Sequence, residues 1–400
     1  MPFFNTATLG RTSRQYILAM SLVNLSLLVF QAYFIFYLQE SGLSYLQMSI
    51  IYSVNLAFCA FLSLPMGNIA DRYGRRRALA TGIAVTAGSM LIYAFTRNFT
   101  AFLIAEVFWA IGWALVNGSN EAWVYDRLRK EGRAAEGSLA FTAMMSISYV
   151  LGVVAGIIAS ALVTISLNMP FLGAAIIAIV CAVMVWRSLE ENYGMETVAL
   201  RTILGECLRY YRNHVSLQML TVAETCRYTA GTIYLFLYQP YLVTIGLGTD
   251  MLGIYFSILM LCSATGAFLA PRASSRIGYH RVMVLSSGGL LTGFTLLAMG
   301  PSLEVSCFLF ALCGLSYGLG WPPLMVWRND LVPDRIRASA LSLFASFTYL
   351  AGAAMTTILG GLLDATSPLM GFLFAAAIAL FSVPLYLGAF RRSGTAPSSS

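Results

Sequence analysis

The stretch Gly67-Asn-Ile-Ala-Asp71-Arg72-Tyr-Gly74-Arg75-Arg76-Arg77 decides how the whole chain is interpreted. It separates two apolar runs, which indicates a short polar loop between two helices. Gly67 lets the helices approach closely, and Gly74 permits a tight turn. The arginines hold such a turn at an anionic membrane surface, where Asp71 can pair with a neighbouring arginine or a helix N-terminus. The stretch therefore predicts a loop at one face of a membrane.

The composition of the chain agrees with this interpretation. Of the 400 residues, 58% are hydrophobic and only 10% are charged, and the mean hydropathy is +0.76. Soluble proteins carry roughly 25% charged residues. A soluble globule this apolar would expose large hydrophobic patches and aggregate. Soluble enzymes, secreted domains, disordered chains and coiled coils are therefore excluded, and we expect an all-α protein that crosses the membrane many times.

Apolar segments long enough to cross about 30 Å of hydrocarbon occur twelve times, at about 20 residues per crossing. The first lacks a small-residue cleavage site and is expected to be a retained helix rather than a signal peptide. The predicted spans are 14–38, 45–70, 78–96, 99–125, 137–163, 170–187, 214–243, 250–270, 281–300, 302–327, 338–363 and 368–390.

The basic residues predict the orientation of these spans. Of the 24 lysines and arginines, all but two fall in segments on the side of the two termini. Arg97 lies on the opposite side, and Arg227 lies inside a span. Basic residues are enriched in cytoplasmic loops. We therefore expect both termini in the cytoplasm and the protein in the cell membrane, and the net charge of +7 does not indicate a nucleic-acid partner.

A long polar stretch divides the chain into two halves of six spans each. The predicted parts are an N-terminal bundle over 1–187, a cytoplasmic linker over 188–213 and a C-terminal bundle over 214–400. Within the linker, apolar residues recur at helical spacing, which predicts an amphipathic helix on the cytoplasmic face. These residues are Leu200, Ile203, Leu204, Cys207, Leu208 and Tyr211.

The two halves repeat each other at a constant offset. Trp123-Val-Tyr-Asp126 matches Trp327-Arg-Asn-Asp330, and Arg72-Tyr-Gly74 matches Arg276-Ile-Gly278, both 204 residues apart. Paired six-helix bundles related by an axis along the membrane normal form the architecture of secondary transporters, with a site near the midplane. The offset therefore predicts two repeats around one site.

The stretch 67–77 resembles the signature loop of the major facilitator superfamily: a glycine, then Asp-Arg, a second glycine and a basic run. The resemblance extends over the whole chain through the twelve spans and the linker. It implies a cytoplasmic lock that holds the halves together while the outside is open. A positive anchor without a gating role is the alternative. The residues implied are Gly67, Asp71, Arg72, Gly74, Arg75 and Arg76, with Asp126 as partner.

Other features refine the resemblance. The second loop has Pro271 and Ser275 where the first has Gly67 and Asp71, so we expect a weaker lock there. The stretch 117–126 resembles superfamily members assigned to drug or small-metabolite export. Two departures weigh against an exporter: Ile157 stands where many antiporters have proline, and the arginine often found early in the fourth span is missing, with Glu106 nearby.

Charged residues inside spans are functional candidates because each costs about 2.5–3.5 kcal/mol to insert. Glu224 and Arg227, at i and i+3, can pair, and a purely structural pair is the alternative. Glu106 could instead be hydrated near the outer surface, and Tyr317 could be a packing aromatic. In the superfamily, spans one, four, seven and ten line the cavity. The expected cavity residues are Asn24, Gln31, Glu106, Trp113, Asn117, Asn120, Glu224, Arg227, Tyr228, Tyr238 and Tyr317.

The pattern predicts a secondary transporter rather than an enzyme. No GxxxxGK[ST] phosphate loop occurs, which excludes a primary pump. The two histidines and seven cysteines show no ligand spacing, so no metal or cofactor is expected. A buried carboxylate can exchange protons near neutral pH. We expect a monomer in the lipid bilayer that exports small amphipathic or cationic compounds with H⁺ as coupling ion and Glu224 as coupling residue; the alternative is a carrier of a small metabolite or organic anion bound by Arg227.

Overall fold

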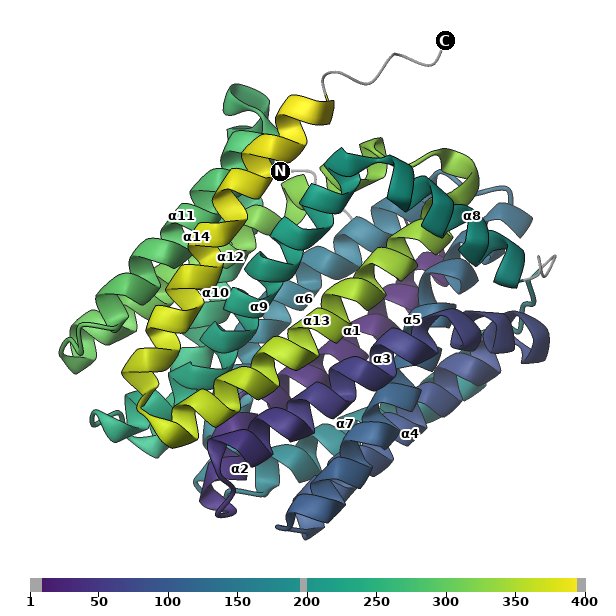
Figure 1. Ribbon diagram of the computed structural model, residues 1–400. Helices are drawn as coiled ribbons and strands as arrows, with labels where there is room; N and C mark the ends of the chain where they lie inside the picture. Colours follow the sequence, from purple (N-terminus) through teal and green to yellow (C-terminus); the bar gives the residue numbers. More distant parts are fainter. Residues whose placement is uncertain (1–8, 195–199, 394–400) are drawn as a thin grey trace. The chain divides into compact units, whose positions relative to one another are not determined.

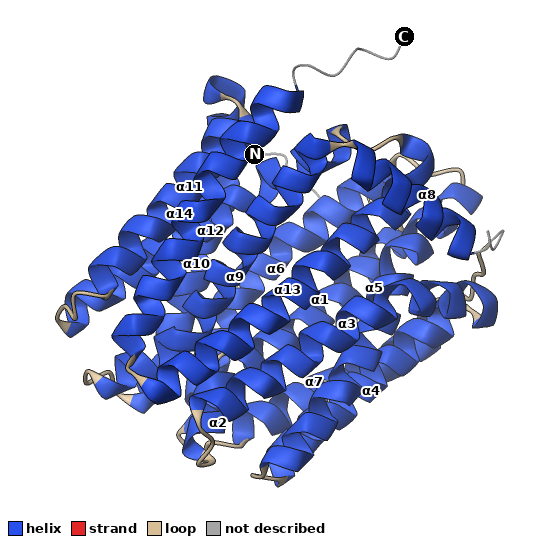
Figure 2. Ribbon diagram, viewed as in Figure 1, coloured by secondary structure: helices blue, strands red, loops and turns tan. Residues whose placement is uncertain are grey.

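The computed structural model describes residues 9–194 and 200–393, and these residues form helices and loops without a strand (Figure 2). Ten of the helices are long and apolar enough to cross a membrane, among the residues described. The helices are α1 (Arg11–Gln31), α2 (Phe34–Glu40), α3 (Tyr45–Tyr73), α4 (Arg75–Phe95), α5 (Phe99–Lys130), α6 (Glu136–Val163), α7 (Met169–Ser188), α8 (Leu200–Asn213), α9 (Val215–Thr244), η2 (Thr249–Met251), α10 (Leu252–Ile277), α11 (Tyr279–Leu297), α12 (Leu303–Asp330), η3 (Asp334–Ile336), α13 (Arg337–Ala365) and α14 (Pro368–Ser393).

The helices match the predicted spans. The first span lies within one apolar stretch, Arg11–Glu40, which has a local break because α1 ends at Gln31 and α2 begins at Phe34. Tyr33 leaves helical geometry at the break (φ −127°, ψ 6°). Its hydroxyl lies 3.2 Å from Ser160 Oγ and 3.2 Å from the Asp250 carbonyl. These contacts are made far along the chain, so the local sequence pattern could not reveal the break.

Two predicted spans, α9 and α11, are not among the ten helices that are apolar enough by composition. α9 contains Glu224 and Arg227 near its middle, which lowers its mean hydropathy. The twelve spans and the orientation of the termini stay predictions.

The described helices divide into two compact units. Unit 1 comprises the described residues of 1–42, 57–197 and 250–257, and unit 2 those of 43–56, 198–249 and 258–400. α3 and α10 therefore each contribute to both units. The predicted division at 188–213 stays a prediction.

Unit 1 is held together by close packing of α4 against α5 and α7, and of α1 against α6 and α7. α4 and α5 meet backbone to backbone, because a Cβ added at Gly82 would lie 2.7 Å from the Gly112 carbonyl oxygen. Small residues permit such an approach between membrane helices. Phe30, Tyr93 and Phe171 fill the interior with ring contacts.

In unit 2, α9 packs against α13 and α14, and α11 packs against α12 and α14. Figure 1 shows α11, α12 and α14 running alongside one another. Tyr241, Phe310 and Phe372 form mutual ring contacts inside this unit. α10 approaches α12 closely, because a Cβ added at Gly266 would lie 2.1 Å from the Leu315 carbonyl oxygen.

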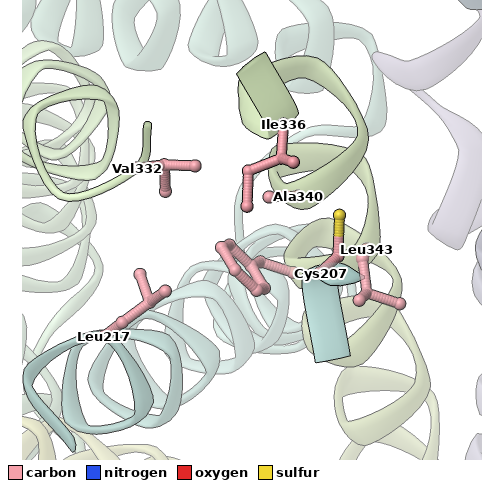
Figure 3. Close-up of a cluster of buried hydrophobic side chains, with 7 residues drawn as sticks. Cys207, Leu217, Val332, Ile336, Ala340 and Leu343 are labelled. Atoms are coloured by element: carbon pink, nitrogen blue, oxygen red, sulfur yellow. The ribbon is translucent and has the colours of Figure 1, made fainter. Parts of the chain in front are cut away.

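α8 lies within the stretch where the amphipathic helix was predicted. Its apolar face packs on protein, against a buried cluster of Cys207, Leu217, Val332, Ile336, Ala340, Leu343 and Phe344 (Figure 3). Leu204 and Tyr211 lie partly buried against this cluster, whereas Leu208 is 37% exposed. The side chains of Leu200 and Ile203 lie outside the described part of the structure. α8 is therefore fixed to η3, α9 and α13 of its own unit.

Candidate functional site

Arg75 forms the centre of a charged cluster at the end of unit 1 where α3 meets α4. Its Nε donates to Asp71 Oδ1 at 2.7 Å, and its Nη1 donates to Asp126 Oδ2 and to the Ala122 carbonyl. Arg75 is only 6% exposed, and both carboxylate side chains are 29% exposed. The structure thus brings together Asp71, Arg75 and Asp126, which we call the Arg75 cluster.

The glycines of this loop have separable roles. Gly74 has φ +106°, which is unfavourable for residues with a Cβ. It is the single residue between α3, which ends at Tyr73, and α4, which begins at Arg75. α3 and α5 approach each other closely at Gly67, but the missing Cβ that permits this approach belongs to Gly118 on α5 and not to Gly67. A Cβ at Gly118 would lie 2.9 Å from Gly67 Cα, whereas a Cβ at Gly67 would meet no atom within 4 Å.

The other two arginines of the predicted lock lie apart from the Arg75 cluster. Arg72 is exposed, and its guanidinium lies 5.5 Å from the centroid of the Tyr73 ring. Arg76 instead faces Glu191: its backbone N–H donates to Glu191 Oε1 at 2.8 Å, and its Nε lies 3.5 Å from Glu191 Oε2. Neither Arg72 nor Arg76 forms an ion pair with Asp71 or Asp126, among the pairs between described residues.

Residues that the sequence analysis did not propose also join this region. Trp123, which is 1% exposed, donates its indole N–H to the Glu190 carbonyl at 2.8 Å. Asn192, also 1% exposed, donates its side-chain amide to the Trp123 carbonyl at 3.0 Å. Both acceptors are main-chain carbonyls, so the residue types in this segment give no signal for these contacts.

The matching loop of unit 2 is built differently. α10 ends at Ile277 and α11 begins at Tyr279, with Gly278 at φ +85° between them. Tyr279 therefore stands at the position of Arg75. Ser275 donates its hydroxyl to the Arg272 carbonyl at 2.9 Å. Within the part of unit 2 that the structure describes, no ion pair occurs in the α10–α11 loop, which agrees with the weaker lock expected there.

A second charged group lies inside unit 2, on α9. Arg227 donates from Nε to Glu224 Oε2 at 2.9 Å and from Nη2 to Glu224 Oε1 at 3.0 Å, a bidentate pair. Arg227 is 0% exposed and Glu224 is 4% exposed. The predicted pairing at i and i+3 is thus present and fully buried.

Two other helices complete the surroundings of this pair. Arg227 Nη1 donates to the Tyr317 carbonyl of α12 at 3.2 Å, and its guanidinium lies 4.7 Å from the centroid of the Tyr317 ring. That ring occupies the space left by Gly231, where an added Cβ would lie 2.1 Å from it. Tyr386 of α14 donates its hydroxyl to Glu224 Oε2 at 3.4 Å. Arg227 therefore binds its own helix and α12, while Glu224 also reaches α14.

The remaining predicted residues of unit 2 lie nearby on α9. The Tyr228 ring lies 5.7 Å from that of Tyr349, and a Cβ added at Gly352 would lie 3.3 Å from Tyr228. Tyr238 is 1% exposed, and its hydroxyl accepts a hydrogen bond from Gln239 Nε2 at 2.9 Å. Tyr228 therefore faces α13, whereas Tyr238 is satisfied by its neighbour on α9.

The predicted polar residues of unit 1 lie in several surroundings. Glu106 is 4% exposed and accepts a hydrogen bond from the Tyr93 hydroxyl at 2.6 Å, so it faces α4 inside the unit. Asn24 donates to Ser148 Oγ of α6 at 2.8 Å. Asn117 is exposed, and Asn120 has a buried Oδ1 without a hydrogen-bond partner among the described residues. Trp113 lines a small void between α1 and α4, and Gln31 ends α1 beside the helix break.

Among the described residues, no group of three or more His, Cys, Asp or Glu side chains could hold a metal ion. The Arg75 cluster and the Glu224–Arg227 pair can form and break ion pairs within a helical protein.

Comparisons with known proteins agree on one family. The model of the Major Facilitator Superfamily matches residues 16–210 and 220–400. An uncharacterized MFS-type transporter, YxaM of Bacillus subtilis (strain 168), is 22% identical over 384 residues, which cover 92% of each chain. The crystal structure of the nucleoside transporter NupG has a TM-score of 0.77 at 15% identity, covering 96% of this chain and 100% of that one. A POT family transporter bound to a thioalcohol-conjugated peptide has a TM-score of 0.79 at 15% identity, covering 96% and 97%.

These solved structures establish the fold, and the match of the family model along the chain establishes the family. The resemblance carried by the 67–77 loop is thereby confirmed. With its many apolar helices, the chain is a multi-pass membrane protein, and it belongs to the Major Facilitator Superfamily of transporters.

Proposed function

We propose that the chain is a proton-coupled secondary transporter that works by alternating access and exports small amphipathic or cationic compounds. In this proposal both termini lie in the cytoplasm and the protein lies in the cell membrane as a monomer. The observation that carries the proposal is the buried bidentate pair of Glu224 and Arg227.

The pair has the properties of a coupling element. Each charge placed in mid-membrane costs about 2.5–3.5 kcal/mol on insertion scales, and mutual pairing offsets part of this cost. Both carboxylate oxygens of Glu224 accept hydrogen bonds from Arg227. A proton that binds Glu224 therefore competes with Arg227 for the same oxygens. Protonation and rearrangement of α9 against α12 are linked in this way.

The same pair suggests how a cationic substrate could act. A cation that approaches Glu224 competes directly with Arg227 for the carboxylate oxygens. Tyr228 lies four residues after Glu224 on α9, and the ring of Tyr317 from α12 packs against Arg227. Aromatic rings of this kind attract cations and apolar groups. Export of amphipathic cations in exchange for protons fits these contacts.

A specific observation also supports the alternative, a carrier of a small metabolite or organic anion. A guanidinium has five N–H donors, and Arg227 uses three of them on Glu224 and Tyr317. A carboxylate on the substrate could take the remaining donors, or displace Glu224. In this alternative Arg227 contacts the substrate and Glu224 competes with it.

The Arg75 cluster has a separate role in the proposal. Arg75 is nearly buried and joins the end of α3 to the end of α5 through Asp71 and Asp126. We infer that this cluster belongs to the cytoplasmic lock that closes while the outside is open. Asp71, Arg75 and Asp126 carry this role, while Arg72 and Arg76 lie beside them.

Proton flux in liposomes tests the coupling. Purified protein is reconstituted with a pH-sensitive dye inside, and tetraphenylphosphonium or citrate is added as a cationic or anionic probe. We expect one probe to move protons through the wild type, and Glu224→Gln to lose this response. Glu304→Gln, at the exposed start of α12, is the matched control and keeps it. A full proton response in Glu224→Gln would overturn the assignment of Glu224.

The substrate class is tested by thermal stability of the same protein. If tetraphenylphosphonium stabilises the protein and still does so in Arg227→Ala, the result supports a cationic substrate. Stabilisation by citrate that Arg227→Ala abolishes supports the anion alternative. Citrate stabilisation that persists without Arg227 contradicts the contact assigned to that residue.

A further inference from the structure

The six residues 189–194 that follow α7, which we call the strap, are bonded through their main chain to both ends of the Asp71–Arg75 ion pair. The Arg75 backbone N–H donates to the Asn192 carbonyl at 3.0 Å. The Gly194 backbone N–H donates to the Asp71 carbonyl at 3.2 Å. The two residues whose side chains form the ion pair are therefore also held in place by one distant segment.

The strap also supplies the missing N-terminal cap of α4. The first N–H groups of a helix have no partner within the helix. Gly74, the residue before α4, has no side chain that could cap them. The Asn192 carbonyl accepts from Arg75 N–H, and Glu191 Oε1 accepts from Arg76 N–H at 2.8 Å. Glu191 further places a negative charge at the positive end of the helix dipole.

A third set of contacts fastens the strap to α5, the helix that carries Asp126. Asn192 donates to the Trp123 carbonyl, and Trp123 donates to the Glu190 carbonyl. Arg127, the residue after Asp126, pairs with Glu190 at 2.5 Å. The strap thus contacts α3, α4 and α5, the three helices that contribute Asp71, Arg75 and Asp126.

The fit between the strap and the Arg75 cluster is tight. A Cβ added at Gly194 would lie 2.5 Å from Asp71 Cγ, and a Cβ added at Gly74 would lie 2.6 Å from Glu191 Cδ. The added Cβ at Gly194 would also lie 2.6 Å from Asp71 Cβ, close to the main chain, whereas the added Cβ at Gly74 meets only the carboxylate end of the Glu191 side chain. Gly194 therefore permits the close contact on which the main-chain bonds depend.

We propose that the strap is a positioning element that holds Arg75 between Asp71 and Asp126. This inference rests on the proposed role of the Arg75 cluster as a cytoplasmic lock. Asn192, Glu191 and Gly194 act through their contacts with Arg75, Arg76 and Asp71. Loosening the strap lets Arg75 move relative to Asp126, which weakens the lock without removing any of its charges.

The test measures opening at the cytoplasmic side directly, because it needs no substrate. Spin labels are placed at Lys130→Cys, at the exposed end of α5, and at Arg276→Cys, at the exposed end of α10, in a background without native cysteines. Electron–electron double resonance then gives the distribution of distances between the labels. Arg75→Ala, which breaks the lock, is expected to move this distribution toward longer distances.

Gly194→Ala is the strap variant, and Gly88→Ala on α4, where an added Cβ meets no atom within 4 Å, is its matched control. We expect Gly194→Ala to shift the distances in the same direction as Arg75→Ala, and Gly88→Ala to leave them unchanged. The double variant Gly194→Ala/Arg75→Ala is expected to shift no further than Arg75→Ala alone, since both changes act on one contact.

A second pair of variants covers the case in which Gly194→Ala does not fold. Glu191→Ala removes the cap of Arg76 N–H without adding an atom, and Tyr193→Ala removes an exposed side chain of the strap that forms no hydrogen bond or ion pair with the described residues. We expect Glu191→Ala to shift the distances and Tyr193→Ala to behave as the wild type. Melting temperatures of all variants establish that each is folded.

The outcomes separate the strap from the lock. If Arg75→Ala shifts the distances while Gly194→Ala and Glu191→Ala match their controls, the strap is not a positioning element and the lock stands. If the double variant shifts by the sum of the single variants, the strap acts independently of Arg75, which also overturns the inference. If Arg75→Ala itself produces no shift, the proposed lock fails.

Discussion

Trp123 and Trp327 lie at equivalent ends of α5 and α12, 204 residues apart, but only the Trp123 indole has a hydrogen-bond partner among the described residues. Trp123 Nε1 donates to the Glu190 carbonyl, whereas Trp327 Nε1 is buried and has no partner among the described residues. Each side chain is 1% exposed. The two repeats are therefore similar in helix pattern, but they differ in the hydrogen bonds made by equivalent buried side chains near their loops.

This difference predicts unequal effects of the same substitution. Trp123→Phe removes a made hydrogen bond and leaves the Glu190 carbonyl without it, which costs about 1 kcal/mol beyond the loss of packing. Trp327→Phe removes a donor that has no described partner, so it costs only the packing. Melting temperatures of the two variants provide the comparison. An equal decrease in both would contradict the finding that only the Trp123 indole forms a stabilising hydrogen bond.

The buried pair on α9 predicts strong non-additivity. Arg227→Met leaves Glu224 as an uncompensated buried carboxylate, which costs about 3–5 kcal/mol. The double variant Glu224→Gln/Arg227→Met removes both charges and is expected to be more stable than Arg227→Met alone. Unfolding in sodium dodecyl sulfate measures these free energies. If the double variant loses as much unfolding free energy as the two single variants together, the two side chains are not coupled.

The contact between α3 and α5 predicts opposite effects of two glycine substitutions. Gly118→Ala places a Cβ 2.9 Å from backbone atoms of Gly67, and overpacking of this kind costs about 1–3 kcal/mol. Gly67→Ala meets no atom within 4 Å and is expected to gain about 0.5–1 kcal/mol from helix propensity. Thermal unfolding of both variants shows whether each substitution lowers or raises stability. Destabilisation by Gly67→Ala would contradict the prediction.

Burial under α8 predicts slow alkylation of Cys207. Its side chain is 0% exposed, and burial raises the pKa of the Cys207 thiol above its usual value. Since the thiolate is the nucleophile, less of it is present at any given pH near neutrality, and alkylation of folded protein is slow. Leu208→Cys in a Cys207→Ala background is the control, because Leu208 is 37% exposed.

The labelling rate of each thiol is followed with N-ethylmaleimide from pH 7 to pH 9. We expect the Leu208→Cys thiol to react quickly at pH 7 and the Cys207 thiol to react mainly after unfolding. Equal rates in the folded protein would show that α8 is not held on the cluster beneath it.

The sequence predicted those features that depend on local spacing. The helices α5 and α7 begin and end close to the predicted spans, and the i, i+3 spacing of Glu224 and Arg227 predicted their pair. The spacing of Leu204, Cys207 and Tyr211 predicted the buried face of α8. In each case the helical repeat alone determines which side chains lie together.

Features that depend on distant segments escaped the sequence analysis. Periodicity showed that α8 has an apolar face, but not that protein from η3 and α13 covers it. Tyr386 reaches Glu224 from α14, and the break at Tyr33 is stabilised by Ser160 and Asp250. Asn192 lies in a polar segment whose composition resembles any linker. None of these contacts leaves a periodic trace in the local sequence.

The cap of α4 has a consequence for biosynthesis. Arg76 and the glutamate that satisfies its N–H are 115 residues apart in the chain. While a ribosome is still making α5, α6 and α7, the first turn of α4 has to rely on water or headgroups instead. The first turn of α4 is therefore capped only after residue 192 has been synthesised, so a nascent chain stopped at the end of α7 would be a folding intermediate in which this turn lacks its partners.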